Sequence, residues 1–317
     1  MVVHVQVLSV QSVETAPSLL LSTETRRFLF NVGDGTQRLC MEHHVRLAKL
    51  QQVFLTELRT HAVGGLPGMV LTVSDTGKPG LHVHGPVGTK KYLKATRHFL
   101  YRPDFKLEAS EVLSSASDGK KKKTKGCYED DEVVVHAVAV PKPRAGAKRK
   151  LNESPSLSSG PSEGEEHNSH VSASYVVETR TQRGKFLVDR AVALGVPKGK
   201  LFGQLHQGKD VTLPDGRVVK SSDCVLPSVP AAGCVIVSCP TTAHVDALVS
   251  SEGFNRYREV EGKAPEVQVE VVFHLGGMDV LRHAKYAEWT RSFGAHALYR
   301  ASAKLQAQLQ AVFPRAF

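Results

Sequence analysis

Two histidines, His82 and His84, stand at a spacing that a metal ion could use. They lie in a short apolar run, and a β-strand over Leu81–His84 puts both imidazoles on one face. No acidic residue or cysteine joins the pair in a motif, whereas protein metal sites usually take three or four ligands. The cysteines are scattered without a CxxC pair, which supports neither a disulfide framework nor a Cys-rich zinc site and fits a reducing compartment: Cys40, Cys127, Cys224, Cys234 and Cys239.

A basic stretch interrupted by glycine and proline, residues 195–220, is the best candidate for binding. Its glycines let the backbone approach a phosphate chain closely, and folded RNA is bound largely through shape and phosphate contacts. Spacing alone favours an ordinary exposed basic loop over an RNA-binding segment. The candidate RNA-binding residues are Lys198, Lys200, Lys209, Arg217, Lys220, Gly195, Pro197, Gly199 and Gly203.

Composition and charge narrow the class of protein. The 317 residues are 41% hydrophobic, which is enough for a sizeable core, and the net charge of +10 favours polyanionic partners. The apolar runs are too short to cross a bilayer, so no membrane partner is expected. The start of the chain lacks a presequence, which disfavours mitochondrial import and points to the nucleus or cytoplasm. The lysines at 120–123 and the basic cluster at 142–150 are best explained as solvated linker charge, with import signals or extra RNA affinity as the alternatives.

Strands alternate with helices along most of the chain, a pattern that predicts a layered α/β domain. Residues 1–140 form its first part, 141–170 a disordered insertion of Pro, Gly, Ser, Glu and Lys, and 171–317 the remainder, with an arm at about 183–222. The turn Gly33-Asp34-Gly35 precedes a helix that Thr36 could cap. Strands are expected at Val2–Val10, Ser18–Thr23, Arg27–Val32, Gln52–Thr56, Leu81–His84, Val133–Val140, Val171–Thr179, Cys234–Val237 and Val269–Leu275, and helices at Thr36–His44, 64–73, Thr89–Leu100, Phe186–Leu194 and Lys304–Val312.

Four motifs, in this order, resemble those of the tRNase Z branch of the metallo-β-lactamase superfamily. Residues 28–38 resemble the signature F-N-x-G-[ED]-G-x-Q-R, and Phe54-Leu55-Thr56 with Gly65-Leu66-Pro67-Gly68 frames the position of the family's metal motif. Residues 85–89 resemble the next strand-to-helix turn, and residues 193–203 with 211–217 resemble the family's Gly-Pro arm. The resemblance implies an αββα sandwich with a protruding basic Gly/Pro arm, and it favours RNA binding by residues 195–220 over the ordinary exposed loop.

The chain departs from the active pattern at every metal motif. Where active members carry H-x-H-x-D-H for zinc, this chain has the degenerate motif Glu57, Arg59, His61 and Ala62. Arg59 keeps its charge and offers no lone pair, and Ala62 has no ligand atom. Cys239 aligns with the family's bridging Asp, and His296 lacks the context of its last histidine. The resemblance therefore implies no catalytic residue, metal or cofactor in this chain.

This pattern is similar to the amino-terminal half of long-form tRNases Z. It implies a half that binds pre-tRNA and supports endonucleolytic removal of the 3′ trailer, while a carboxy-terminal half on the same longer chain or on a separate chain holds the zinc. Residues 311–317 resemble the place where that half ends. One alternative is an inactive stand-alone scaffold for protein interactions. Another is an enzyme with a rearranged metal site built from His61, His82, His84 and nearby acidic residues.

Overall fold

A computed structural model describes residues 3–10, 17–98, 100, 102–112, 127–141, 171–182, 184–197, 199–213, 216–294 and 297–300, the last four by their backbone alone. Several sequence predictions fall outside these residues. They are Lys198, His296, the lysines at 120–123, the basic cluster at 142–150, the insertion from residue 142 to 170 and the helix over 304–312.

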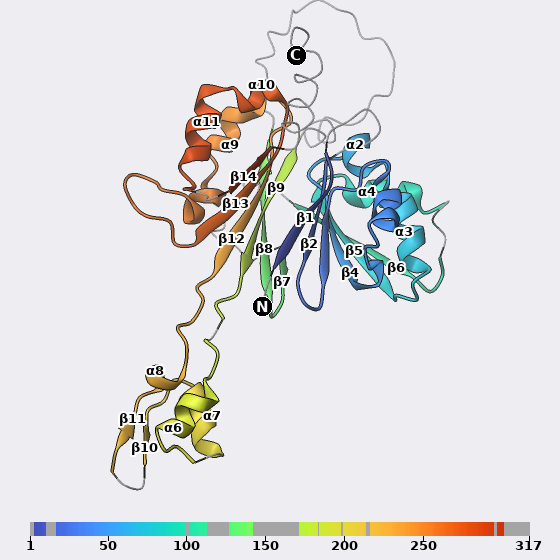
Figure 1. Ribbon diagram of the computed structural model, residues 1–317. Helices are drawn as coiled ribbons and strands as arrows, with labels where there is room; N and C mark the ends of the chain where they lie inside the picture. Colours follow the sequence, from blue (N-terminus) through green and yellow to red (C-terminus); the bar gives the residue numbers. More distant parts are fainter. Residues whose placement is uncertain are drawn as a thin grey trace, which may run out of the picture. The chain divides into compact units, whose positions relative to one another are not determined.

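The first sheet holds six strands in chain order (Figure 1). The strands are β1 (His4–Ser9), β2 (Ser18–Ser22), β3 (Arg27–Phe30), β4 (Leu50–Phe54), β5 (Gly80–Pro86) and β6 (Lys106–Val112). The first three pair antiparallel, and β3 to β6 pair parallel. Parallel neighbours need crossover connections, which here are α1 (Thr36–Glu42) with η1 (Leu47–Lys49), α2 (Thr60–Val63) with α3 (Leu66–Ser74), and α4 (Thr89–Thr96).

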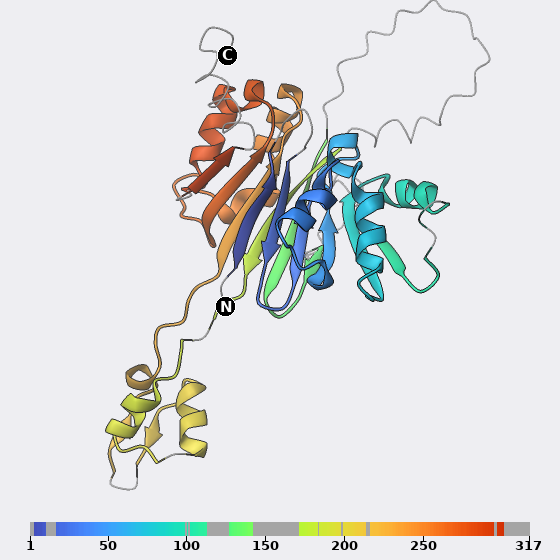
Figure 2. The ribbon, with the colours of Figure 1, turned by 45° about the vertical axis from the view of Figure 1, so that its right-hand side comes forward.

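The second sheet has the order β14-β13-β12-β9-β8-β7. Its strands are β7 (Tyr128–Glu129), β8 (Val133–Val140), β9 (Ser172–Thr179), β12 (Ala232–Ser238), β13 (Gln268–Leu275) and β14 (Ala297–Arg300). Figure 2 shows the two sheets face to face, with helices on the outer side of each. The helices beside the second sheet are η3 (Thr242–His244), α9 (Val245–Val249), η4 (Glu252–Tyr257), α10 (Met278–Leu281) and α11 (Ala284–Arg291).

Alternation along the strands divides the core into layers. Val53 and Val83, paired between β4 and β5, pack with the helices over the first sheet. Their neighbours Phe54 and His84 point to the opposite face, between the sheets. Successive side chains of a strand alternate between faces, so each strand of the first sheet contributes to two apolar layers. The result is the predicted αββα arrangement.

An aromatic cluster joins the sheets at the level of β4. Phe54 stacks on Phe30 with ring centroids 4.9 Å apart, and Tyr175 of β9 meets Phe54 edge-on at 5.3 Å. The buried Tyr175 hydroxyl donates a 2.7 Å hydrogen bond to the carbonyl of Leu55. Burial raises the pKa of Tyr175 well above its ordinary value, so the hydroxyl stays protonated as a donor.

Residues Thr179–Ala232 form a separate compact unit, inserted in the chain between β9 and β12. We call this unit the arm. Its elements are α6 (Val188–Ala193), α7 (Lys200–His206), the hairpin of β10 (Val211–Thr212) and β11 (Val218–Val219), and α8 (Ser221–Cys224). They enclose a small core of Ala191, Val196, Leu205, Val211, Leu213, Val219 and Cys224.

The segments that enter and leave the arm pair with each other. Gln182 and Val229 exchange two backbone hydrogen bonds, of 2.9 and 2.8 Å. A Cβ on Gly184 would lie 1.5 Å from the carbonyl oxygen of Leu226, so only glycine fits this crossing. The arm therefore begins and ends in a two-stranded ribbon. That the arm protrudes remains a prediction.

Three sequence predictions need correction. The basic segment at 195–220 is more than a loop, because it folds into α7 and the β10–β11 hairpin over the arm's own core. The predictions also missed β6, where exposed and half-buried residues alternate without a strong apolar run. Thr36 is the first residue of α1 and does not cap it. Gly35, at φ 75°, holds the capping position, and the Thr36 hydroxyl lies 3.0 Å from that of Ser18.

We expect Tyr175→Phe to lower the free energy of unfolding by about 1–3 kcal/mol, because the carbonyl of Leu55 loses its buried donor. Urea titration measures the loss. Tyr92→Phe is the matched control, since the Tyr92 hydroxyl is half-buried and its bond to the Val63 carbonyl is longer, 3.2 Å. Equal losses in the two variants would contradict a structural role for the Tyr175 bond.

Candidate functional site

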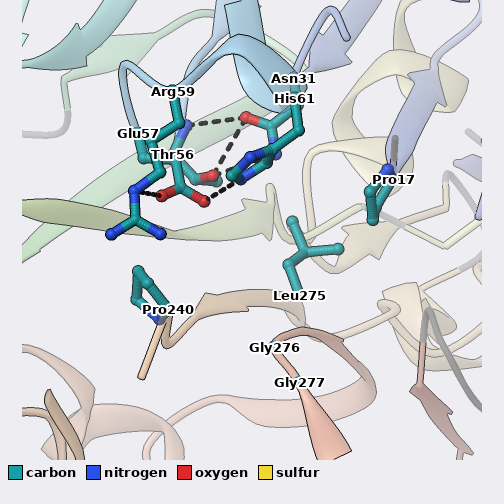
Figure 3. A pocket seen from close by; sticks show the side chains of 10 residues that line it. All are labelled: Pro17, Asn31, Thr56, Glu57, Arg59, His61, Pro240, Leu275, Gly276 and Gly277. Carbon is teal, nitrogen blue, oxygen red and sulfur yellow. Dashed lines mark hydrogen bonds and ion pairs between the residues drawn. The ribbon is translucent and has the colours of Figure 1, made fainter. Parts of the chain in front are cut away.

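A cleft of about 210 Å³ opens where strands of both sheets end (Figure 3). The loops after β3 and β4 contribute one side, and the loops after β12 and β13 contribute the other. In a sandwich of this kind, loops at the ends of strands are the usual place for functional side chains. The lining residues are Pro17, Asn31, Thr56, Glu57, Arg59, His61, Pro240, Leu275, Gly276 and Gly277.

Asn31 joins the loops that follow β3 and β4. Its backbone is left-handed, with φ 60°, a conformation that asparagine tolerates better than most residues. Its side-chain oxygen accepts a hydrogen bond from the Thr56 backbone N–H at 2.8 Å, and its amide nitrogen lies 3.0 Å from the Thr56 hydroxyl. Both residues are buried. Asn31 thus fixes the point at which the Glu57-to-Ala62 loop leaves the sheet.

Backbone contacts hold the same two loops further along. The N–H of Val32 donates to the carbonyl of Ala62, and the N–H of Gly65 donates to the carbonyl of Val32, at 2.8 and 2.9 Å. A Cβ on Gly65 would lie 2.1 Å from the carbonyl oxygen of Gly33. The close approach explains why glycine stands at position 65. The frame that would present ligands from the Glu57-to-Ala62 loop is therefore built in this chain.

The frame presents an ion-paired cluster. The Glu57 carboxylate accepts from His61 Nε2 at 2.5 Å, and Arg59 Nε lies 3.5 Å from its other oxygen. Figure 3 shows the three side chains together at the cleft. The side chain of Glu57 is 13% exposed, whereas those of His61 and Arg59 are 40% and 57% exposed. The Glu57 carboxylate thus contacts both His61 and Arg59, and the Arg59 guanidinium lies beside it.

These residues do not fit a zinc ion. Ala62 is buried and its methyl group has no ligand atom, and Arg59 would repel a cation. At the position of the bridging Asp, burial raises the pKa of the Cys239 thiol to about 12, which disfavours the thiolate form that binds metal. Among the described residues, no three His, Cys, Asp or Glu side chains are grouped as metal ligands would be.

His82 and His84 lie on one face of β5, as predicted, but they have other partners. Their rings stack with centroids 4.4 Å apart. His82 Nε2 lies 2.8 Å from the Ser110 hydroxyl, and His84 Nε2 lies 2.8 Å from the side-chain oxygen of Gln52. His82 lines a different hollow from the one that His61 lines. The rearranged site of His61, His82 and His84 is therefore wrong, because the fold does not bring the three together.

The predicted arm residues that the structure describes are exposed. Lys200, Lys209, Arg217 and Lys220 lie on the surface of the arm, as do Gly195, Pro197, Gly199 and Gly203. Gly195 and Gly199 have φ of 81° and 143°, which a side chain would strain. Within the described part of the chain, no carboxylate pairs with Lys200, Lys209 or Lys220. Sequence positions 179–232 hold nine Lys and Arg against four Asp, about half of the chain's net charge.

Sequence reasoning missed the pairing within the degenerate motif. Glu57 precedes α2 and His61 lies in its first turn, so the two are four residues apart at a point where the backbone turns into a helix. That spacing was a usable signal. The bridge from Asn31 to Thr56 had no such signal, because it joins residues that are 25 positions apart.

Solved structures with a similar fold define the class of protein. The chain resembles the crystal structure of a long-form RNase Z from yeast, with a TM-score of 0.60 and 18% identity, over 94% of this chain and 36% of that one. It also resembles the human short-form tRNase Z, with a TM-score of 0.51 and 14% identity, over 93% of this chain and 91% of that one. The fold is that of the metallo-β-lactamase superfamily.

Comparisons of sequence show which family the chain resembles. A family described as tRNase Z endonuclease matches residues 6–65. The chain is 28% identical to zinc phosphodiesterase ELAC protein 2 of Homo sapiens, over 99% of this chain and 41% of that protein. It is 30% identical to tRNAse Z TRZ4, mitochondrial, of Arabidopsis thaliana, over 100% of this chain and 35% of that protein. The chain is therefore similar to members of the tRNase Z family, spans about two-fifths of the length of these relatives and corresponds to their amino-terminal half.

We expect His84 to make the protein less stable in acid. Burial, reinforced by repulsion from His82, lowers the pKa of His84 to about 3 from its ordinary value of 6.5. The unfolded chain therefore binds the extra proton first, and stability is lost as the pH falls from 6.5 towards 3, by up to about 1.4 kcal/mol per pH unit.

Chemical unfolding at pH 7, 6 and 5 measures this dependence. In His84→Phe the free energy of unfolding should depend less on pH, because Phe keeps the stacking position on Phe54 without titrating. This holds whether or not the variant is less stable than the parent at pH 7. The exposed His4, changed to Phe, serves as the control and should keep the parent slope. An unchanged slope in His84→Phe would show that His84 is not the group responsible.

Proposed function

We propose that this chain is the tRNA-binding, zinc-ligand-deficient half of a tRNase Z. In this proposal it supports endonucleolytic removal of the 3′ trailer from pre-tRNA. The chemistry belongs to a zinc-containing carboxy-terminal half, on the same longer chain or on a separate one. Similarity to the tRNase Z family and the match to about two-fifths of its long relatives support this division of work.

The arm carries the proposal. Lys200, Lys209 and Lys220 are exposed, are not engaged by carboxylates in the described residues, and belong to a unit with a core of its own. Cations held on a small ordered unit lose less entropy on binding a phosphate backbone than cations on a disordered loop. Phosphate contacts of this kind supply affinity and orientation without reading sequence, which suits a protein whose substrates share a fold.

The side chains of the cleft support the proposal that this chain does not itself catalyse hydrolysis. Hydrolysis in this fold needs metal-bound water, and Arg59 and Ala62 offer no lone pair to hold the metal. The neighbouring frame of Asn31, Thr56 and Gly65 has nevertheless been kept. We interpret it as a structural support for the loops of the sandwich.

The second candidate function is a stand-alone scaffold for protein interactions. One observation favours it: of the seven large apolar residues that are exposed in the described part of the chain, all but Met41 lie in the arm. They are Val188, Val192, Leu194, Val218, Leu226 and Val229. An aliphatic surface of this kind suits a protein partner as well as RNA. Dependence on salt separates the two, because phosphate contacts weaken steeply with salt and apolar contacts barely respond.

Localisation to the nucleus or cytoplasm stays a prediction. Among the described residues no helix has the length and apolar character needed to span a membrane. Relatives from Drosophila melanogaster and Arabidopsis thaliana carry the word mitochondrial in their names, which describes those proteins.

We expect the arm variant Lys200→Ala, Lys209→Ala and Lys220→Ala to bind a folded pre-tRNA at least tenfold more weakly at low salt. Each lost phosphate contact should also reduce the slope of log affinity against log salt by about 1. Fluorescence anisotropy between 50 and 200 mM salt, conditions over which such contacts respond strongly, measures both quantities.

The matched control removes three exposed cations from other parts of the chain: Arg46→Ala, Lys91→Ala and Lys263→Ala. It should keep most of the affinity, because the proposal places the contacts in the arm and not in the overall charge. Equal affinities for parent and arm variant would sink the proposal. Affinity that does not change with salt, and that is lost only when Val188→Ser and Val192→Ser are introduced, would favour the protein scaffold.

The purified chain, by itself, should bind pre-tRNA without cleaving it and should hold much less than one zinc per chain. Elemental analysis and a cleavage assay on the same sample test both expectations. Cleavage that disappears with a chelator, together with stoichiometric zinc, would mean that the interpretation of Glu57, Arg59 and Ala62 as a site without ligands is wrong.

A further inference from the structure

We infer that the groove between α4 and β6 is a second RNA-binding surface, one that takes a single-stranded segment. The inference rests on the proposed function, since it takes RNA as the ligand of this chain. The groove has a volume of about 710 Å³ and is lined by Lys90, Leu93, Lys94, Arg97, Leu100, Arg102, Pro103, Phe105, Leu107 and Ala109. Figure 1 shows α4 and β6 together at the edge of the first sheet.

Three of its cations form a line along α4. Lys90, Lys94 and Arg97 are spaced by four and three residues, which puts them on one face of the helix, about 6 and 4.5 Å apart along its axis. All three are exposed, and none has a carboxylate partner among the described residues. A line of cations at this spacing matches the regular charges of an extended phosphate backbone.

This arrangement is unfavourable for the helix alone. Like charges one turn apart repel, and Lys90 and Lys91 stand in the first turn, where the helix dipole disfavours cations. Glu111 offsets part of this destabilisation of α4, because one of its carboxylate oxygens accepts from the backbone N–H groups of Gly88 and Lys90 at 3.0 and 2.9 Å. The carboxylate thus caps the backbone and leaves the Lys90 ammonium unpaired. A polyanionic ligand would remove the remaining repulsion.

The acidic residues near α4 do not close the groove. No Asp or Glu is among its lining residues, and the exposed Asp104, in the turn before β6, is not part of the wall. Asp75 lies 3.7 Å from Arg102, at the edge of ion-pair distance. Glu108 is engaged elsewhere, by Lys106 and His82. The groove therefore presents positive charge over an apolar floor.

The floor favours single-stranded RNA over a duplex. Leu93 and Leu100 are buried beneath the cations, and Phe105 and Leu107 are half-buried, so that apolar surface faces the groove. In a duplex the bases are stacked inside and only phosphates are available. A single strand offers both its phosphates and its unstacked bases, and aromatic side chains such as Phe105 are common stacking partners for bases. An acidic polypeptide is the competing occupant, and the experiment below separates it.

The test uses the whole chain and a fluorescent oligouridylate of twelve nucleotides. We expect Lys90→Ala, Lys94→Ala and Arg97→Ala together to weaken binding at least tenfold at 50 mM salt. Three lost contacts should reduce the salt slope by about 2, because each phosphate of a single strand contributes about 0.7. Alanine is the strongest helix former, so α4 should persist, which circular dichroism checks. The control is again Arg46→Ala, Lys91→Ala and Lys263→Ala, which removes the same charge outside the groove wall and should leave oligouridylate binding near the parent's.

Failure of this inference differs from failure of the proposed function. The arm variant Lys200→Ala, Lys209→Ala and Lys220→Ala should lose affinity for folded tRNA and keep its affinity for oligouridylate, and the groove variant should do the reverse. If the groove variant binds oligouridylate as the parent does, or if the parent does not bind it, the groove assignment is overturned. If polyglutamate displaces oligouridylate equally well at equal charge concentration, the groove belongs to acidic polypeptides and the RNA assignment is overturned. If the arm variant binds folded tRNA as the parent does while the groove variant loses oligouridylate, the assignment of tRNA binding to the arm fails and the groove assignment is unaffected.

Discussion

The amide of Asn31 joins two loops that would otherwise leave the ends of β3 and β4 independently. Asn31 holds a left-handed backbone, accepts from the Thr56 N–H and contacts the Thr56 hydroxyl, so it fixes the point from which the segment Glu57 to Gly65 starts. The close packing of Gly65 on Gly33 and the bond from Tyr175 to Leu55 depend on the same local geometry. A rigid frame of this kind keeps its shape even when the side chains that it presents have changed chemistry.

Strong local patterns made most of the sandwich predictable from the sequence. Apolar runs located β2, β3, β8 and β9 to within a few residues, and the glycines around Asp34 located the turn before α1. Sequence reasoning failed where structure depends on distant partners. In β6 the residues are half-exposed, and it forms because β5 supplies a parallel edge to pair with. The short elements of the arm likewise depend on a core of seven small or medium side chains spread from Ala191 to Cys224.

The candidate site was predictable to the same limited degree. Loss of the metal ligands could be seen residue by residue, because ligand chemistry belongs to the side-chain type alone. What replaced them could not, since the Glu57–His61–Arg59 cluster is a matter of rotamers and distances. His82 and His84 show how little spacing alone says about function. Their spacing was suitable for metal binding, yet Ser110 and Gln52 already satisfy one nitrogen of each ring, and the two rings stack on each other.

The ribbon at the start of the arm bears on how the chain folds. Thr179 and Ala232 are 53 positions apart, yet the Ala232 N–H donates to the Thr179 hydroxyl at 2.9 Å, directly beside the pairing of Glu178 with Gly233. Closing an unstructured loop of that length would carry a large entropic penalty before β9 and β12 could pair. Since the arm has its own core and its two ends pair, the folded arm holds the start of β12 beside the end of β9. For the second sheet, a unit of 54 residues then acts as the tight turn of an ordinary hairpin.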